Sequence, residues 1–496
     1  MASLNLVRVI SLTKDADLTL EALEAVAFEG ATLSLETELL EVVEAGHAAM
    51  LAALGTGARV YGVTTGMGYL AGTDLVPADM LTHQRNLLVG RAAGSPPWLE
   101  RAEARAVLTT RLANFLSGHA GVSPALCSYI TERLNDDFVP AIPRRAAGSA
   151  GEVLPLAHAF QTFLGIGTVL GPDGAPEPAA DALAKRGAEP YEPAAKEGVA
   201  LLAGAPGALA LAAARRREAT TLADRLSRVW AYAIGALGAP LAPYDQATAS
   251  LGNDPILTSV IEDLGGYLAG AAPTGFALQA PVSFRVIPQV ATHLRRALAR
   301  LEDDIRLALG AVTDSPAFVG GRFIGNGAFH AIELAAGMDT LGAAVIRSGE
   351  LAAQHIHRLL DHRFSGLPDQ LTPHPGPRSG LIVVQKRAAG VLNELRRLAS
   401  PASVGLTDTS LGQEDAMTFG FEAAEKLRRI EELVIEIAAC ELVTARQAWA
   451  LRGLPAPPGL AAMAALVEAV VPPVNEDRPL GGDIEAAMRL LQGHEL

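Results

Sequence analysis

The feature that most constrains the fold is a group of long segments in which apolar residues recur near helical spacing. They run from Gly207 to about Leu237, from Val282 to about Ala311, from Ser379 to about Ala399 and from Ser410 to about Leu451. The last would form a helix of ~40 residues, which is ~60 Å long at 1.5 Å per residue. Helices of this length usually lie in a bundle or in the core of an oligomer. We therefore expect a mostly α-helical protein in which residues 206–496 form a long helical bundle.

The first 205 residues are expected to form a separate N-terminal domain with a small α+β portion. Val7–Ile10 is strand-like, and a helix with a plausible N-cap is expected from about Ser34 onward. The same domain carries two irregular loops, one at Tyr61 and one at residues 148–151. Both loops are candidates for a functional site.

The composition excludes several classes of protein and partner. Half of the 496 residues are apolar and aromatic residues are few, which favours closely packed helices over a β-sandwich. The net charge of −14 argues against nucleic acid or an anionic membrane as a partner. Cys127 and Cys440 are too far apart for a disulfide framework or a metal knuckle, so we expect a cytoplasmic protein. We expect no secretory signal at Met1–Leu4 and no membrane span, because the apolar stretches are interrupted.

A stretch of small residues leads into an apolar helix within residues 143–158. Residues 148–151, Gly-Ser-Ala-Gly, would not be chosen for a packed helix interior. Leu154–Phe160 reads as the start of a buried helix, and Pro155 suits the first turn because its missing N–H would have no partner there. A phosphate-cradling loop is set aside, since the Lys-Ser/Thr ending is missing and Glu152 would repel phosphate.

This stretch resembles the signature Gly-x-x-Gly-Ala-Ser-Gly-Asp-Leu-x-Pro-Leu-x-His of the histidine, phenylalanine and tyrosine ammonia-lyase and aminomutase family. In that family Ala-Ser-Gly condenses into the electrophile MIO (4-methylidene-imidazol-5-one), and the Ser hydroxyl leaves as water. Anchored on Pro155 and His158, the triad here is Ser149-Ala150-Gly151. Ala150 has no hydroxyl to lose, so we expect no MIO and no other cofactor. The resemblance implies an ammonia-lyase-like fold.

The loop that contains Tyr61 resembles the family pattern Tyr-Gly-x-Asn-Thr-Gly-x-Gly, with Thr64 at the Asn position. Three glycines and two threonines after one tyrosine indicate an irregular loop, and spacing alone would favour a surface turn. The resemblance implies that Tyr61 is the catalytic base. Arg91 stands where the histidine-selective branch often has His, and it could be either a solvated cation or a clamp for a carboxylate or phosphate.

Three further motifs supply candidate site residues. Residues 279–290 resemble Gln-Asp-x-Tyr-Ser-x-Arg-x-x-Pro-Gln, which implies that Arg285 binds a substrate carboxylate beside Gln279. Phe329 and Glu414 match family positions in the same way. Other site positions of the family are small or apolar here: Ala203, Ala280, Val282, Ala328 and Ala416. A metal site is not expected, because His355 and His357 are two apart on a helix and do not share a face.

Four interpretations remain open. The first is an MIO-independent enzyme in which Tyr61 and Glu414 move protons on a small carboxylate- or amine-bearing substrate, by elimination, isomerisation or intramolecular conjugate addition. The second is an inactive relative that serves in binding or assembly. The third is a lyase whose serine was changed to Ala150, and the fourth is cyclisation of residues 148–150. We favour the first and expect a homotetramer whose sites draw on more than one chain.

Overall fold

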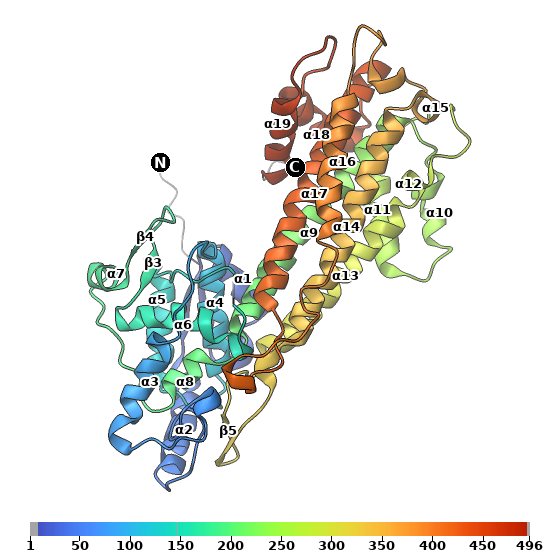
Figure 1. Cartoon of the computed structure of the whole chain (residues 1–496). Coiled ribbons are helices and arrows are strands. Elements are labelled where there is room, and N and C mark those ends of the chain that lie inside the picture. Colours follow the sequence, from blue (N-terminus) through green and yellow to red (C-terminus); the bar gives the residue numbers. More distant parts are fainter. Residues whose placement is uncertain (1–7, 146, 494–496) are drawn as a thin grey trace, which may run out of the picture. The chain divides into compact units, whose positions relative to one another are not determined.

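The computed structural model describes residues 8–145 and 147–493, most of them in α-helices (Figure 1). The chain forms two compact units. The first unit contains residues 1–215, 301–338 and 402–425, and the second contains residues 216–300, 339–401 and 426–496. The mostly α-helical fold class is confirmed.

The expected boundary at residue 205 separates only part of the first unit. Residues 301–338 and 402–425 also belong to that unit, although they follow the boundary by about a hundred residues or more. The reason is that four long helices each contribute residues to both units. They are α9 (Pro206–Leu237), α13 (Ile287–Leu309), α14 (Ile332–Leu359) and α17 (Gly420–Arg452).

Of the four long helices, α9, α13 and α17 coincide with expected segments, although two of these segments start differently, and α14 was not predicted. The helix expected from Ser410 begins at Gly420, because Ser410, Leu411 and Phe419 have positive φ values of 53°, 56° and 54° that an α-helix cannot contain. The segment expected from Val282 is divided into α12 (Val282–Arg285) and α13, since Val286 leaves the helical conformation. The segment expected from Ser379 is α16 (Ile382–Arg397).

The remaining helices of the first unit are shorter. They are α1 (Leu20–Phe28), α2 (Thr37–Leu54), α3 (Met80–Val89), α4 (Arg101–Phe115), α5 (Pro124–Asn135), α6 (Val153–Gln161), α7 (Ala179–Lys185) and α8 (Glu197–Leu202). The helix expected from about Ser34 begins only at Thr37, because Ser34 and Leu35 lie in a strand. Its N-cap residue Glu36 makes no side-chain cap hydrogen bond. Thr19 caps α1 by accepting from the Ala22 N–H, and Ser123 caps α5 by accepting from the Leu126 N–H. Helix α6 confirms the buried helix expected around Pro155.

Within the described part of the chain, short strands form three two-stranded sheets. In the first, β1 (Val9–Leu12) pairs in parallel with β2 (Thr32–Leu35), so the predicted strand is confirmed at Val9 and Ile10. Val7 and the start of the chain lie outside the described residues. The others are antiparallel: β3 (Thr168–Leu170) with β4 (Pro176–Pro178), and β5 (Ala317–Val319) with β6 (Arg322–Ile324).

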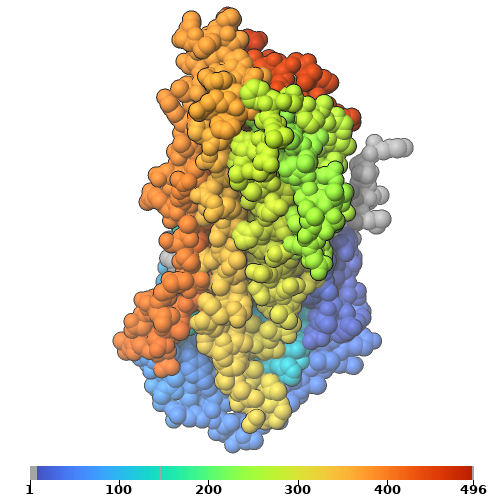
Figure 2. Space-filling view, turned by 90° about the vertical axis from the view of Figure 1, so that its right-hand side faces the viewer, coloured from blue at the N-terminus to red at the C-terminus, as the bar shows by residue number. Residues whose placement is uncertain are grey.

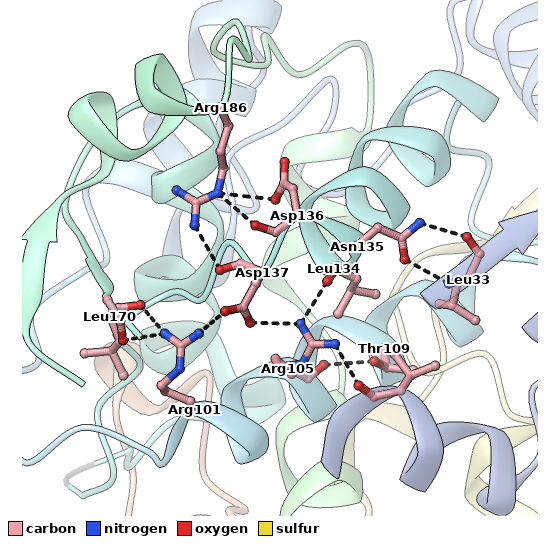
Figure 3. A network of polar contacts seen from close by, with 12 residues as sticks. Leu33, Arg101, Arg105, Thr109, Leu134, Asn135, Asp136, Asp137, Leu170 and Arg186 are labelled. Carbon is pink, nitrogen blue, oxygen red and sulfur yellow. Dashed lines mark hydrogen bonds and ion pairs between the residues drawn. The ribbon is translucent and has the colours of Figure 1, made fainter. Parts of the chain in front are cut away.

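A network of arginines and aspartates fixes helix α4 in the first unit (Figure 3). Arg105 donates to the backbone oxygens of Leu134 at 2.8 Å and Val26 at 2.7 Å, and its Nη1 lies 3.2 Å from Asp137 Oδ1. Arg101 bonds to the same carboxylate and to backbone oxygens of the β3 end. The network therefore ties the first turns of α4 to α1, α5 and the end of β3.

The second unit is a bundle in which small residues allow close helix packing. A Cβ added to Gly349 in α14 would lie 2.8 Å from Leu395 in α16 and 3.0 Å from Val434 in α17. The other helices of this unit are α10 (Gln246–Ala249), α11 (Pro255–Tyr267), α15 (His362–Ser365), α18 (Ala461–Val470) and α19 (Gly481–Gln492). Figure 2 shows that the segment from about residue 240 to 290, coloured green to yellow, lies at the surface.

Two helical stretches, Glu197–Leu237 and Ala328–Leu359, are long and apolar enough to cross a membrane by length and composition alone. The most apolar window of the first is entirely buried inside the protein, and that of the second is half buried. Core helices of soluble proteins pass the same test, so the expected absence of a membrane span stays a prediction.

Candidate functional site

The first unit contains a cavity of about 970 Å³ that brings several predicted residues together. It is lined by Arg59, Val60, Tyr61, Met67, Ala150, Gly151, Ala203, Ser315, Pro316, Phe323, Gly325, Asn326, Gly327, Phe329, His330, Gln413, Glu414, Asp415 and Ala416. Tyr61, Glu414, Phe329, Ala150 and Gly151 are all sequence candidates. Four loops that are far apart in the chain therefore meet at one cavity.

Tyr61 is held by its own loop. Its hydroxyl accepts a hydrogen bond from the Gly68 N–H at 2.8 Å. Gly62 has φ 70°, and a Cβ there would lie 2.9 Å from the Val199 side chain, so this turn needs glycine. Thr64, at the position of the family Asn, accepts from the Val60 N–H at 2.7 Å. The threonine thus closes the turn locally.

The environment of Tyr61 keeps its hydroxyl protonated. Burial is the largest effect and raises the pKa of Tyr61, and the nearby negative charge of Glu414 acts in the same direction. The Gly68 N–H and the charge of Arg91 lower the pKa but do not outweigh the burial. The pKa of Tyr61 is therefore raised on balance, although the Gly68 N–H and Arg91 stabilise the phenolate.

Glu414 connects its own loop to the loop at residue 150. Its Oε2 accepts from the Ala150 N–H at 3.1 Å, and its Oε1 accepts from the Ser410 hydroxyl at 2.8 Å. The Thr409 hydroxyl lies 3.4 Å from Oε2. A Cβ added to Gly68 would be 3.8 Å from Oε1, so the Tyr61 loop passes beside the same carboxylate.

The loop at residues 149–152 is an irregular turn. Gly151 has φ 70° and ψ 24°, its carbonyl accepts from the Gly204 N–H at 3.1 Å, and Phe329 packs against it. The Ser149 hydroxyl donates to the Ala147 carbonyl at 3.3 Å, and Ser149 does not line the cavity. Of the predicted triad, only Ala150 and Gly151 face the open space.

A buried carboxylate below this loop was not predicted as a site residue. Glu152 accepts from the Gly207 N–H at 2.6 Å and the Ala208 N–H at 2.7 Å, so it caps the N-terminus of α9. Burial raises its pKa to about 7, against the opposing effect of these N–H groups and of Arg111. The signal in the sequence was the Gly-rich segment before the long helix that begins at Pro206, because an acidic side chain stabilises the N-terminus of a helix.

Arg111 lies fully buried under the same loops. It donates to the Ala203 carbonyl at 3.1 Å, and a Cβ on Gly204 would lie 2.7 Å from its Nη2. Its Nε and Nη1 have no hydrogen-bond partner within the described part of the chain. Lys196 and Asp314, a fully buried ion pair at 2.6 Å, stand beside this support. The turn at Ala203 and Gly204 thus packs against buried charged side chains, which the sequence did not predict.

Arg91 follows α3 and is half-buried beside the cavity loops. Its charge lowers the pKa of Tyr61, and the negative charge of Glu414 opposes the effect of burial on the pKa of Arg91, which is lowered on balance. Among residues 8–145 and 147–493 no hydrogen bond or ion pair to its guanidinium is found. The nearby His83 has a buried Nε2 without a partner in the same described range.

Gln279 and Arg285 belong to the second unit and do not line this cavity. The two side chains contact each other, with Arg285 Nη1 donating to Gln279 Oε1 at 3.1 Å. The predicted residues therefore fall into two groups, one at the cavity and one on the α12 turn.

Comparisons with known proteins identify the family. The sequence model of aromatic amino acid lyases matches residues 18–471. Histidine ammonia-lyase from Sorangium cellulosum is 33% identical over 97% of this chain and 96% of its own length. That from Streptomyces coelicolor is 34% identical over 93% of each chain.

Solved structures agree with this result. Tyrosine aminomutase from Streptomyces globisporus superposes with a TM-score of 0.91 at 28% identity, covering 98% of this chain and 97% of the other. Histidine ammonia-lyase from Trypanosoma cruzi gives 0.87 at 28% identity, covering 98% and 93%. The predicted ammonia-lyase-like fold is thereby confirmed. The chain belongs to the aromatic amino acid lyase family.

Proposed function

We propose that this ammonia-lyase-family enzyme works without MIO and performs acid–base chemistry on a small substrate that carries a carboxylate. The observation that carries the proposal is Ala150, which stands where the family signature has its dehydrating serine. Elimination, isomerisation and intramolecular conjugate addition on an activated substrate each need a proton acceptor and a proton donor, but no electrophile.

The residues of the loop do not fit the family's cofactor. Ring closure in the signature expels one water that includes the amide hydrogen of the middle residue, and a second water that includes its hydroxyl. Ala150 has no hydroxyl, and its amide hydrogen is used to bind Glu414 Oε2. No step through such a ring is therefore assigned.

In the proposed chemistry Tyr61 donates a proton and Glu414 accepts one. A raised pKa keeps the Tyr61 hydroxyl protonated at neutral pH, which suits a general acid better than a base. Glu414 lines the same cavity and is oriented by Ala150 and Ser410. General acid–base catalysis typically contributes ~100- to 10,000-fold, which suffices for an activated substrate.

Arg91 would hold the anionic group of the substrate. A half-buried guanidinium is a strong, directional partner for a carboxylate or a phosphate. Tyr61 and Glu414 both affect the pKa of Arg91, so an anion bound to its guanidinium would be near both side chains, although Arg91 does not itself line the cavity. An amine on the same substrate would bind to the Glu414 carboxylate.

A homotetramer would complete the site with residues of a neighbouring chain. Large apolar side chains are exposed on two loop regions, which favours their burial in an assembly. They are Leu251, Phe276, Leu278, Val282, Val404, Leu406 and Leu411. In this arrangement Gln279 and Arg285 of one chain would join the cavity of another, and a stable monomer in light scattering would exclude it.

The alternative is an inactive relative that binds a ligand without turning it over. Ala203 and Ala416 favour it, because both line the cavity at positions where the family motifs carry Asn and His. These changes also argue against a lyase whose only alteration is the replacement of its serine by Ala150. Cyclisation of residues 148–150 remains the least favoured interpretation.

The test compares two tyrosines of one loop. Tyr61→Phe and the matched control Tyr69→Phe, whose side chain is 59% exposed, are assayed on a panel of amino acids and α,β-unsaturated acids. We expect no ammonia from histidine, phenylalanine or tyrosine. On the substrate that is turned over, the turnover rate of Tyr61→Phe should be ~100- to 10,000-fold lower than that of the wild type. The turnover rate of Tyr69→Phe should be unchanged.

Intact-protein mass gives an independent measurement. The mass should equal that of the sequence, whereas a deficit of two waters would reveal a ring and refute the MIO-independent mechanism. Full activity of Tyr61→Phe would remove Tyr61 from the chemistry, whereas no turnover of any substrate on the panel would strengthen the binding-protein alternative.

A further inference from the structure

The α12 turn presents Arg285 and Gln279 from a base that is fully buried. Phe284 has no exposed surface, while Val282 is 59% exposed on the other side of the turn. The carbonyl oxygens of Ser283 and Phe284 both point into the second unit and are taken by buried side chains. The turn is therefore held by its backbone from below and offers its charged side chain outward.

One anchor is a buried histidine–glutamate pair. His355 Nε2 lies 3.0 Å from the Ser283 carbonyl oxygen, and its Nδ1 lies 2.7 Å from Glu441 Oε1. The side chains of His355 and Glu441 are both 0% exposed. The imidazole also packs on the Phe284 ring, with centroids 4.2 Å apart. The histidine thus connects α12 to α14 and α17 in one contact set.

The second anchor comes from a different element. The Tyr244 hydroxyl donates to the Phe284 carbonyl at 2.9 Å, and burial raises the pKa of Tyr244, so this donor stays protonated. Two neighbouring carbonyls of a four-residue helix are therefore fixed by two side chains from two directions. Inward displacement of α12 is blocked by Phe284.

Hydrogen-bond chemistry specifies the proton content of the pair. The Ser283 carbonyl can only accept, so His355 Nε2 must carry a hydrogen. Nδ1 then faces a carboxyl group, and either the imidazolium donates to it or a protonated Glu441 donates to Nδ1. Burial raises the pKa of Glu441, against the effect of His355, which favours keeping this extra proton. Arg285 and Tyr244 are the other ionisable side chains of the turn and its second anchor.

We propose that His355 and Glu441 are positioning residues that clamp the Ser283–Arg285 turn and thereby fix where the Arg285 guanidinium is presented. Glu441 determines that Nε2 of His355 carries the hydrogen that is donated to the Ser283 carbonyl. This hydrogen bond holds the backbone of the turn in place. The part concerning Arg285 rests on the proposed function, in which Arg285 of one chain joins the cavity of another. The clamp itself does not depend on that role.

Hydrogen–deuterium exchange on the full-length protein tests the clamp. The reporters are the amides of Phe284, Arg285 and Val286, which donate to carbonyls of residues 281 and 282. His355→Phe keeps a ring against Phe284 but removes both ring nitrogens. It should speed exchange of these amides about tenfold, as expected for the loss of one buried hydrogen bond.

Glu441 offers a conservative rescue. In Glu441→Gln the side-chain amide can donate to His355 Nδ1, so Nε2 keeps its hydrogen and still donates to the Ser283 carbonyl. Exchange should therefore stay near the wild-type rate. Glu441→Leu has no polar partner for Nδ1 and should speed exchange of the turn. The matched control is Glu436→Gln on the same helix, where Glu436 pairs with Arg387 at 2.7 Å, and it should leave the turn unchanged.

The outcomes separate the clamp from general destabilisation and from the role of Arg285. Equal effects of Gln and Leu at position 441, or faster exchange spread over α9 and α17, would overturn the clamp. If His355→Phe fails to fold, the Gln and Leu variants of Glu441 still decide. Arg285→Lys should leave exchange of the turn unchanged but lower turnover. If turnover is also unchanged, the proposed role of Arg285 falls and the clamp stands.

Discussion

The cavity of the first unit and the α12 turn of the second hold their polar side chains in opposite ways. At the cavity, loops with left-handed residues such as Gly151 and Leu411 supply backbone N–H groups, and the side chains bind to them. At α12, the buried side chains of His355 and Tyr244 bind backbone carbonyls, and the turn carries Arg285 outward. A backbone-built site survives the loss of a side-chain group, so the loop can keep its shape with alanine at position 150. A side-chain clamp cannot tolerate such losses.

The largest expected contrast is between two phenylalanines. Phe284→Ala removes a fully buried ring from the α12 clamp and should lower the free energy of unfolding by about 3–5 kcal/mol. Phe329→Ala removes a half-buried ring at the cavity and should cost about 1 kcal/mol while it changes ligand binding. Urea denaturation of both variants measures the two costs. Similar costs would show that the cavity depends on side-chain packing as much as the α12 turn does.

The next effect concerns Glu152, the buried cap beneath the cavity. Its pKa is raised from 4.5 to about 7 in the folded protein, so folding favours the protonated form. The stability from this proton is fully present below pH 4.5 and is lost as the pH rises to about 7, which amounts to about 3 kcal/mol. Glu152→Gln should flatten this part of the stability–pH curve.

The control for this measurement is an exposed carboxylate. Glu192 forms a surface ion pair with Arg85 at 3.2 Å, and Glu192→Gln should leave the pH dependence as in the wild type. If the curve of Glu152→Gln has the same slope as that of the wild type between pH 5 and 7, Glu152 is ionised in the fold. The side chain that caps α9 beneath the cavity would then be charged.

The smallest effect is expected from the hydroxyl that orients Glu414. Ser410→Ala removes a hydrogen bond of 2.8 Å and should cost about 1 kcal/mol of stability. Turnover should fall more than this cost suggests, because the carboxylate loses one of the contacts that aim it at the cavity. Thr407→Ala, in the same exposed loop, is the matched control. An unchanged rate for Ser410→Ala would show that the Ala150 N–H alone orients Glu414.

Much of this organisation could be predicted from the sequence. The spacing of apolar residues predicted α9 almost to the residue, because helix formation there is set by the local pattern. The same criterion failed at Ser410, because Ser410, Leu411 and Phe419 are left-handed and residues 413–419 form an irregular loop before α17. Left-handed conformations at Ser and Leu leave no mark in hydrophobic periodicity, and only the packing of the loop beside Glu414 explains them.

The sequence by itself determined which chemical groups are present: alanine at position 150, a phenol at Tyr61, a carboxylate at Glu414 and a guanidinium at Arg285. These follow from residue identity and need no coordinates. Only the tertiary structure decided that Tyr61 and Glu414 share one cavity, and that burial favours the neutral forms of Tyr61 and Glu152. The physical reason is that proximity and desolvation arise from contacts between segments up to 275 residues apart, such as Ala147 and Glu422, which no local pattern records.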